Sequence, residues 1–298
     1  PDYLNETSFP YKKRPYPEEV LFADQLSVVR LLGGWDTNKN NGELNSTKEG
    51  DLIYKDKNGR LKYRWHLLAP RLDPYINLGY TELTIVLDNT PWALPQDPVI
   101  GGFGQISPPA DFLEWETFIK KLCKKLVNLY DYDMVNNWRF RMGTECQGSF
   151  DGEAEHSRFY GSQEEYFKLY DHAAAAVKSV LPDAKFGPFN IAGVDGDITG
   201  YNVNYYELVE HCLNEKNYAT GETGSPFDFA ALSCYSIPKI RDGKYVNTDP
   251  DKKSSSYREF WNKIAELVPE GYKFTEEIHE FGILNSEFGL STDEPGAR

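Results

Sequence analysis

Strand-like segments alternate with helix-like segments along this chain, and that alternation most constrains what it can fold into. The strand-like segments are short, rich in aliphatic and β-branched residues, and often end at glycine or proline. Alternation of this kind is typical of an α/β protein, because a crossover between parallel strands is long enough to hold a helix. Six strands are predicted, at residues 26–32, 82–88, 138–142, 185–189, 227–233 and 281–285.

Amphipathic helices are predicted between these strands. In residues 111–130 the apolar side chains recur at helical spacing, with lysines on the opposite face. Similar patterns cover residues 164–181, 203–214 and 255–268. Residues 36–64 lack periodicity and are rich in Asn, Lys, Asp and Gly, so they predict a long surface loop after the first strand.

Length and charge narrow the class of protein. A chain of 298 residues with 40% hydrophobic content can bury a large core, and we expect one domain over residues 1–298. The net charge of -14 argues against a nucleic-acid partner or an anionic membrane surface, whereas a neutral carbohydrate is compatible with it. No window reaches the roughly 18 to 20 apolar residues of a membrane span. The oligomeric state stays open.

Motifs for metals and cofactors are missing from the sequence. The five histidines form no H-E-x-x-H pair, and no G-x-S-x-G, Walker or dinucleotide-binding motif is present, so neither a metal nor a cofactor is expected. The glycine-rich residues 101–104 predict a loop over a cleft. Free thiols and disulfides both remain open for the four cysteines, which are Cys123, Cys146, Cys212 and Cys234.

Two predicted strands end in a glutamate. Glu145 follows the strand at 138–142, and Glu287 follows the strand at 281–285. A carboxyl group at the C-terminal end of a parallel strand opens toward the loop face, and cleaving an acetal needs two such groups. One glutamate alone would be interpreted as a surface residue, but the pair favours a glycosidase. Glu280 is the main rival of Glu287; it is expected at the start of its strand, with its side chain directed away from the cleft.

The order of these glutamates resembles the clan A glycoside hydrolases, most closely family 39, which contains β-xylosidases and α-L-iduronidases. In that clan a Glu after strand four is the acid/base and a Glu after strand seven is the nucleophile. The resemblance implies these roles for Glu145 and Glu287, which lie 287 − 145 = 142 residues apart. It also implies a (β/α)8 TIM barrel, of which this single catalytic domain shows strands two to seven and is incomplete at both ends.

The resemblance also implies a set of substrate-binding residues. Arg30 would lie near the nucleophile, and Tyr235 would lie at the end of strand six. Thr144 departs from the clan, which usually has an Asn there that contacts the sugar 2-hydroxyl, and a threonine cannot offer the pair of hydrogen bonds of an amide. The remaining expected cleft residues are Trp35, Asp36, His66, Asn89 and Trp92.

The implied function is hydrolysis of an oligo- or polysaccharide by a retaining double displacement, in a secreted or periplasmic protein. A non-catalytic carbohydrate-binding relative with a degenerate or incomplete site is the alternative, motivated by Thr144 and by the incomplete barrel. An interaction scaffold without glycan binding is a third class. The sugar, the linkage and the choice between exo and endo cleavage stay open.

Overall fold

Parallel strands form the centre of the structure, a computed structural model that describes residues 28–34, 48–77, 79–148, 154, 157–194, 198–236, 239–241, 244–246 and 249–283. Four strands form one parallel sheet in the order β1-β4-β7-β8, and β9 pairs in parallel with β12. Their bounds are β1 Val28–Arg30, β4 Thr84–Val86, β7 Arg139–Met142, β8 Lys185–Pro188, β9 Phe229–Ser236 and β12 Thr275–Ile283.

The two sheets are joined between β8 and β9. A parallel bridge pairs Ile191 with Leu232, and the Ser233 N–H donates to the Ile191 carbonyl at 2.8 Å. The six strands therefore follow one another in space in chain order. The set also curves, because Arg30 on β1 and Glu280 on β12 form an ion pair across its two ends. No closed eight-stranded barrel is present within the described residues.

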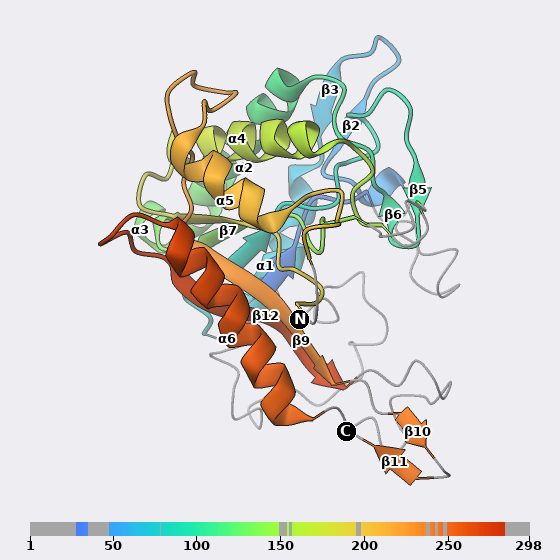
Figure 1. The fold of residues 1–298 in the computed structure, drawn as a ribbon. Helices are drawn as coiled ribbons and strands as arrows, with labels where there is room; N and C mark the ends of the chain where they lie inside the picture. Colours follow the sequence, from blue (N-terminus) through green and yellow to red (C-terminus); the bar gives the residue numbers. More distant parts are fainter. Residues whose placement is uncertain are drawn as a thin grey trace.

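The prediction of strands is confirmed for the first five and wrong in its start for the sixth. That strand begins at Thr275, six residues before the expected position. The sequence interpretation also missed three antiparallel hairpins, which pair β2 (Ile53–Lys55) with β3 (Leu61–Tyr63), β5 (Ile100–Gly101) with β6 (Gly104–Gln105), and β10 (Lys239–Arg241) with β11 (Lys244–Val246). The first lies in the expected loop at 36–64, and the third projects away from the strand set (Figure 1).

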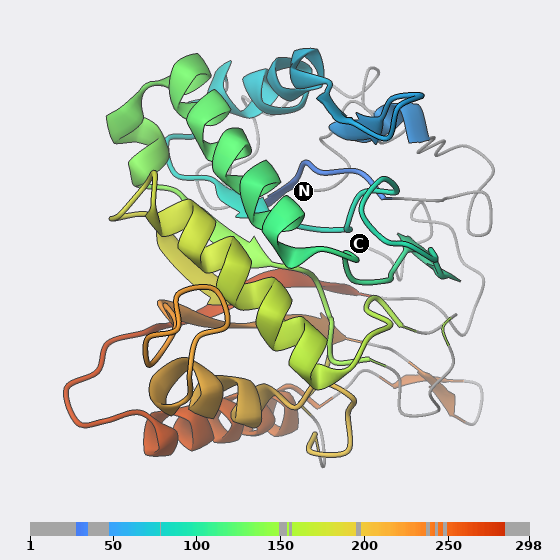
Figure 2. The ribbon, with the colours of Figure 1, turned by 90° about the horizontal axis from the view of Figure 1, so that it is seen from above.

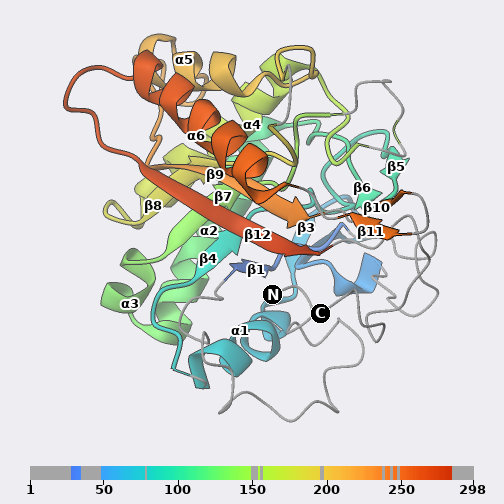
Figure 3. The same ribbon diagram turned by 60° about the horizontal axis from the view of Figure 1, so that its bottom comes forward.

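Helices lie around the outside of the strands (Figures 2 and 3). Their bounds are α1 Leu68–Asn77, α2 Phe112–Tyr130, α3 Tyr132–Asn136, α4 Gln163–Lys178, α5 Tyr205–Asn214 and α6 Pro250–Leu267, with short 3-10 turns η4 Lys48–Gly50 and η5 Trp65–Leu67. Side-chain caps set their starts: Asp111 accepts from two N–H groups of α2, and Ser162 forms a capping box with Glu165 at α4. The four predicted helices are confirmed, although α6 begins five residues before the expected position, and α1 and α3 were missed.

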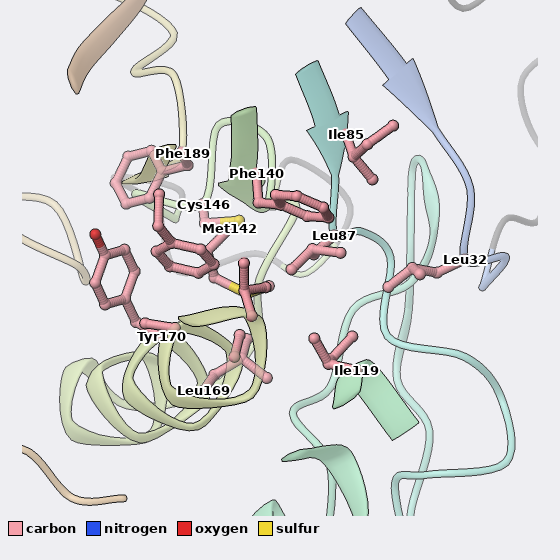
Figure 4. Close-up of a cluster of buried hydrophobic side chains, with 14 of the residues drawn as sticks. Leu32, Ile85, Leu87, Ile119, Phe140, Met142, Cys146, Leu169, Tyr170 and Phe189 are labelled. Carbon is pink, nitrogen blue, oxygen red and sulfur yellow. The ribbon is translucent and has the colours of Figure 1, made fainter. Parts of the chain in front are cut away.

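The main core lies between the sheet and the helices. Val29, Ile85, Phe140 and Phe186 share one register layer across β1, β4, β7 and β8, and all four are at most 1% exposed. Figure 4 shows Phe140 and Ile85 near side chains from α2 and α4. Burial of each such large side chain contributes about 1.5 to 3 kcal/mol. This layer therefore holds the strands against the helices.

The next layer in the same register, Arg30, Val86, Arg141 and Gly187, points to the opposite side of the sheet, since side chains alternate along a strand. Gly187 leaves room there for the Phe229 ring, because a Cβ at residue 187 would lie 2.5 Å from a ring carbon. Two arginines thus enter the space enclosed by the strands. This inner space contains the candidate site.

The four cysteines, which the sequence left undecided, are all free thiols. Burial is the main reason that the pKa of Cys146 rises to about 12, so this thiol is unreactive at neutral pH. Within the described residues no helix has the length and apolarity needed to cross a membrane.

Candidate active site

Glu145 lies on the turn that follows β7, as predicted. Its backbone is in the left-handed region, with φ 49°, an uncommon conformation for a residue other than glycine and one that is enriched at functional sites. The turn is held because the Glu145 N–H donates to the Asn190 carbonyl at 3.0 Å. The carboxylate accepts from the Ser233 hydroxyl at 2.7 Å (Oε1) and from the Arg158 Nε at 3.2 Å (Oε2). Its side chain is 17% exposed, so the carboxylate is shielded but reachable.

A β-bulge in β12 directs a second glutamate inward. Ile278 pairs with Leu232 and Glu280 pairs with Ser233, which leaves His279 as the extra residue of the bulge. The extra residue shifts the alternation of side chains by one position. Glu280 therefore points inward on the same side as Ser233, whereas Phe281 is 65% exposed on the outer side.

Three charged or polar groups contact Glu280. Arg30 Nη2 donates to Oε1 at 3.3 Å, and the Tyr235 hydroxyl donates to Oε2 at 3.1 Å. Arg141 Nη2 lies 3.8 Å from Oε1. Burial acts to raise the pKa of Glu280, but Arg30, Arg141, Arg158 and the Tyr235 hydrogen bond outweigh it and lower the pKa to about 2. Glu280 is therefore ionised at neutral pH.

These contacts correct two expectations about Glu280. The strand begins at Thr275, so Glu280 is its sixth residue and not its start. The side chain enters the inner space because of the bulge, whereas the prediction directed it away. Arg30, which was expected near the nucleophile, and Tyr235, which was expected at the end of strand six, are both hydrogen-bonded to Glu280. Glu287 itself lies outside the described residues.

Arg141, fully buried, links the turn after β7 to β12. Its Nε donates to the Gly143 carbonyl at 3.0 Å, and Nη2 donates to the Thr144 hydroxyl at 2.7 Å. Nη1 lies 3.0 Å from His279 Nδ1. Burial lowers the pKa of His279, so its ring is neutral and Nδ1 is the acceptor, while Nε2 donates to Glu277 at 2.6 Å. One guanidinium thus fixes both carboxylate-bearing segments.

Ser233 lies between the two carboxylates. Its hydroxyl donates to Glu145, its Cα pairs in register with Glu280, and the amide of Asn190 donates to its oxygen at 2.8 Å. Asn190 is completely buried, so its hydrogen bond to Ser233 fixes the position of the Ser233 hydroxyl. The end of β9 therefore holds Glu145 and Glu280 as neighbours in one cluster.

The other predicted cleft residues have separate outcomes. Thr144 is buried, and its hydroxyl accepts from Arg141, so it is already engaged within the protein. Asn89 is also buried, and its amide donates to the Phe103 carbonyl at 2.9 Å, which holds the β5–β6 hairpin. Trp35 and Asp36 lie outside the described residues, and their roles stay predictions.

Trp92 lies in the segment after β4, and His66 lies on η5. The Trp92 N–H and the Gly34 N–H both donate to the buried Asp51 carboxylate, each at 2.7 Å. Burial raises the pKa of Asp51 to about 6, against the effect of these hydrogen bonds. His66 is exposed on η5, and no hydrogen bond or ion pair within the described residues joins it to the cluster around Glu145. Its predicted role is untested.

Sequence reasoning missed Arg141 and Arg158 and rejected Glu280. One signal was available for Glu280: α6 ends close to Pro269, and helix-to-strand loops are usually two to six residues long. That spacing predicts a strand from about residue 275. No local pattern marks the bulge or the arginine contacts. Within the described part of the chain, no cluster of three or more His, Cys, Asp or Glu side chains is arranged to hold a metal ion.

The structure defines an α/β protein whose parallel strands carry paired carboxylates held by arginines. The model of the glycosyl hydrolases family 39 matches residues 16–287. The chain therefore belongs to glycosyl hydrolase family 39.

Individual relatives agree with this membership. The chain is 27% identical over 277 residues to an α-1,4-L-rhamnosidase from Formosa agariphila, covering 88% of this chain and 49% of the relative. It is 26% identical over 213 residues to a β-xylosidase from Caldicellulosiruptor saccharolyticus, covering 71% and 38%. The crystal structure of a monomeric β-xylosidase from Caulobacter crescentus CB15 shares the fold, with a TM-score of 0.58, 20% identity and coverage of 77% and 43%. The chain spans about half the length, or less, of these proteins.

Proposed function

We propose that this chain is the catalytic part of a glycosidase that works by double displacement, with Glu145 as the acid/base and Glu280 as the nucleophile. One observation carries the proposal: the end of β9 contacts both carboxylates, with Ser233 bonded to Glu145 and Tyr235 bonded to Glu280. The six strands would be strands two to seven of a (β/α)8 barrel, which their order and the family membership support.

The environment of Glu280 is suited to a nucleophile, and Glu145 would be the partner that transfers protons. The pKa of Glu280 is lowered to about 2, so its carboxylate is available to attack the anomeric carbon. As the new ester bond forms, the glycosidic C–O bond breaks, and the leaving oxygen takes a proton from Glu145. Glu145 then removes a proton from water, which attacks the same carbon and restores the Glu280 carboxylate. A retaining site of this type has carboxyl groups roughly 5 to 5.5 Å apart.

Glu280 replaces Glu287 in this proposal because of its contacts. A nucleophile in this mechanism has to be ionised and held in place, and Arg30, Arg141 and Tyr235 do both for Glu280. The substrate class is an oligo- or polysaccharide. Among named relatives, one is an α-1,4-L-rhamnosidase and one a β-xylosidase, so α-L-rhamnosides and β-D-xylosides are the first substrates to test.

The test compares matched glutamate variants. The wild-type chain, Glu280→Gln and Glu287→Gln are assayed on 4-nitrophenyl glycosides and on a glycan panel by release of nitrophenol or reducing sugar. We expect Glu280→Gln to lose at least about 1,000-fold in kcat and Glu287→Gln to stay within about tenfold of the wild type. A 2-deoxy-2-fluoro glycoside should label Glu280, which peptide mass spectrometry would locate.

Three outcomes would contradict parts of this proposal. Label on Glu287, with loss of activity only in Glu287→Gln, would return the nucleophile to that residue. A first-formed product with inverted anomeric configuration, seen by NMR, would exclude double displacement. Glycan affinity without any product would favour the carbohydrate-binding alternative.

A further inference from the structure

Arg158 approaches both carboxylates from the segment that precedes α4. Its Nε donates to Glu145 Oε2 at 3.2 Å, and its positive charge contributes to the lowered pKa of Glu280. The guanidinium carbon lies 3.5 Å from the centre of the Phe103 ring on the β5–β6 hairpin. Its side chain is only 13% exposed. Arg158 is therefore a largely buried cation at the centre of the cluster.

One donor of this guanidinium is unused. Nη1 of Arg158 is buried and has no hydrogen-bond partner among the residues that the structure describes. An arginine offers five N–H donors, and buried polar groups in proteins are almost always paired. A buried cationic donor that stays unpaired next to two carboxylates is suited to an acceptor that arrives with a ligand.

The contacts of Arg158 define on which side of the scissile bond that acceptor lies. Arg158 is hydrogen-bonded to Glu145, the group that transfers a proton to the glycosidic oxygen, and its own loop is separate from β12. Because Nε of the same guanidinium bonds to the acid, we place the acceptor of Nη1 on the leaving-group side of the scissile bond. The Phe103 ring, 37% exposed, packs against one face of the guanidinium, and this contact restricts the orientation of Arg158.

We propose that Arg158 is a substrate-binding residue that donates a hydrogen bond from Nη1 to an oxygen of the leaving-group sugar. The natural leaving group is then itself a sugar, bound through its hydroxyl or ring oxygens, and not an apolar aglycone. This inference rests on the proposed function, in which Glu145 is the acid.

The kinetic test varies the leaving group while the hydrolysed sugar stays the same. Arg158→Met and the control Arg60→Met, an exposed arginine in the β2–β3 turn, are assayed on a 2,4-dinitrophenyl glycoside and on the matching disaccharide. Arg158→Met should lose about 10- to 100-fold more in kcat/KM on the disaccharide than on the dinitrophenyl glycoside, and this extra loss should appear chiefly in KM, because a weakened acid would lower kcat instead. Equal losses on both substrates, or none on either, would overturn the proposal.

A binding test separates failure of this inference from failure of the proposed function. Each arginine variant is placed in the Glu280→Gln background, and calorimetry measures affinity for xylobiose, for an α-1,4-linked L-rhamnosyl disaccharide and for the two methyl monoglycosides. We expect Arg158→Met to weaken only disaccharide binding, by about tenfold or more. Unchanged disaccharide affinity, or no binding of either disaccharide, would refute the role of Arg158. Retained turnover in the Glu280→Gln background would instead refute the nucleophile assignment, and the kinetic comparison of the two substrates would then test Arg158.

Discussion

Replacing Arg141 with methionine should raise the pKa of Glu280. Arg141 Nη2 lies 3.8 Å from Glu280 Oε1, and the guanidinium is fully buried. Two unit charges about 4 Å apart interact by about 4 kcal/mol at an effective dielectric constant of about 20, which corresponds to about three pKa units. Arg30 remains in the variant at 3.3 Å, so we expect the pKa of Glu280 to rise from about 2 by about 1 to 3 units.

The change has a second consequence for stability. A carboxyl pKa lowered from 4.5 to about 2, a difference of about 2.5 units, contributes about 3 kcal/mol to the free energy of unfolding. This contribution is present above pH 4.5 and is lost as the pH falls through the folded-state pKa. Arg141→Met should lose roughly 40% or more of this pH dependence of the unfolding free energy, because a rise of about 1 unit or more brings its Glu280 pKa closer to 4.5.

Carbon-13 NMR of labelled glutamate measures the pKa of Glu280 directly, with Glu280→Gln to identify the signal. Urea unfolding at a series of pH values measures the linked stability. Arg139→Met is the matched control on the same strand, since Arg139 contacts Glu277 at 3.1 Å and should leave the pKa of Glu280 unchanged. A Glu280 pKa in Arg141→Met within about 0.3 units of the wild type would refute the assigned coupling.

Three further substitutions test how the site is supported. Asp51→Ala should lower the melting temperature, because the Gly34 and Trp92 N–H groups lose their shared acceptor. It should also remove the gain in wild-type stability expected as the pH falls from about 6 toward 3.8. Gly187→Ala should cost about 1 to 3 kcal/mol in urea unfolding, because the new methyl group meets the Phe229 ring; an unchanged midpoint would contradict this packing. Glu277→Gln should lower the free energy of unfolding by about 1 to 3 kcal/mol near pH 7, because it weakens the hydrogen bond from His279. In the same urea assay the difference from the wild type should vanish below pH 2, where Glu277 is protonated.

Local patterns predicted the parts of the fold whose signals lie within one segment. The helices at Phe112–Tyr130 and Tyr205–Asn214 follow from apolar spacing and a capping side chain, both of which are local. The hairpins were missed because two- or three-residue strands carry too few side chains for alternation to be visible. The position of Glu145 after its strand was predicted for the same local reason, since a short apolar strand ends at Gly143.

The second carboxylate shows where local reasoning stops. Glu280 follows an alternating strand in which Glu277 and His279 point inward, so alternation alone would direct Glu280 outward. The bulge depends on how β12 pairs with β9, and no residue type within β12 predicts it. The arginines that lower the pKa of Glu280 come from β1, β7 and the segment before α4.

The sequence alone thus determined the α/β class, the order of the six strands and the acidic turn after β7, because periodicity and caps act over a few neighbouring residues. Tertiary structure decided which glutamate contacts Arg30 and Tyr235. It also decided that Arg141 donates to the Thr144 hydroxyl and that one donor of Arg158 is unpaired. Each of these depends on contacts between residues far apart in the chain. Charge interactions act through space, and only the folded strands bring these groups within a few ångströms of one another.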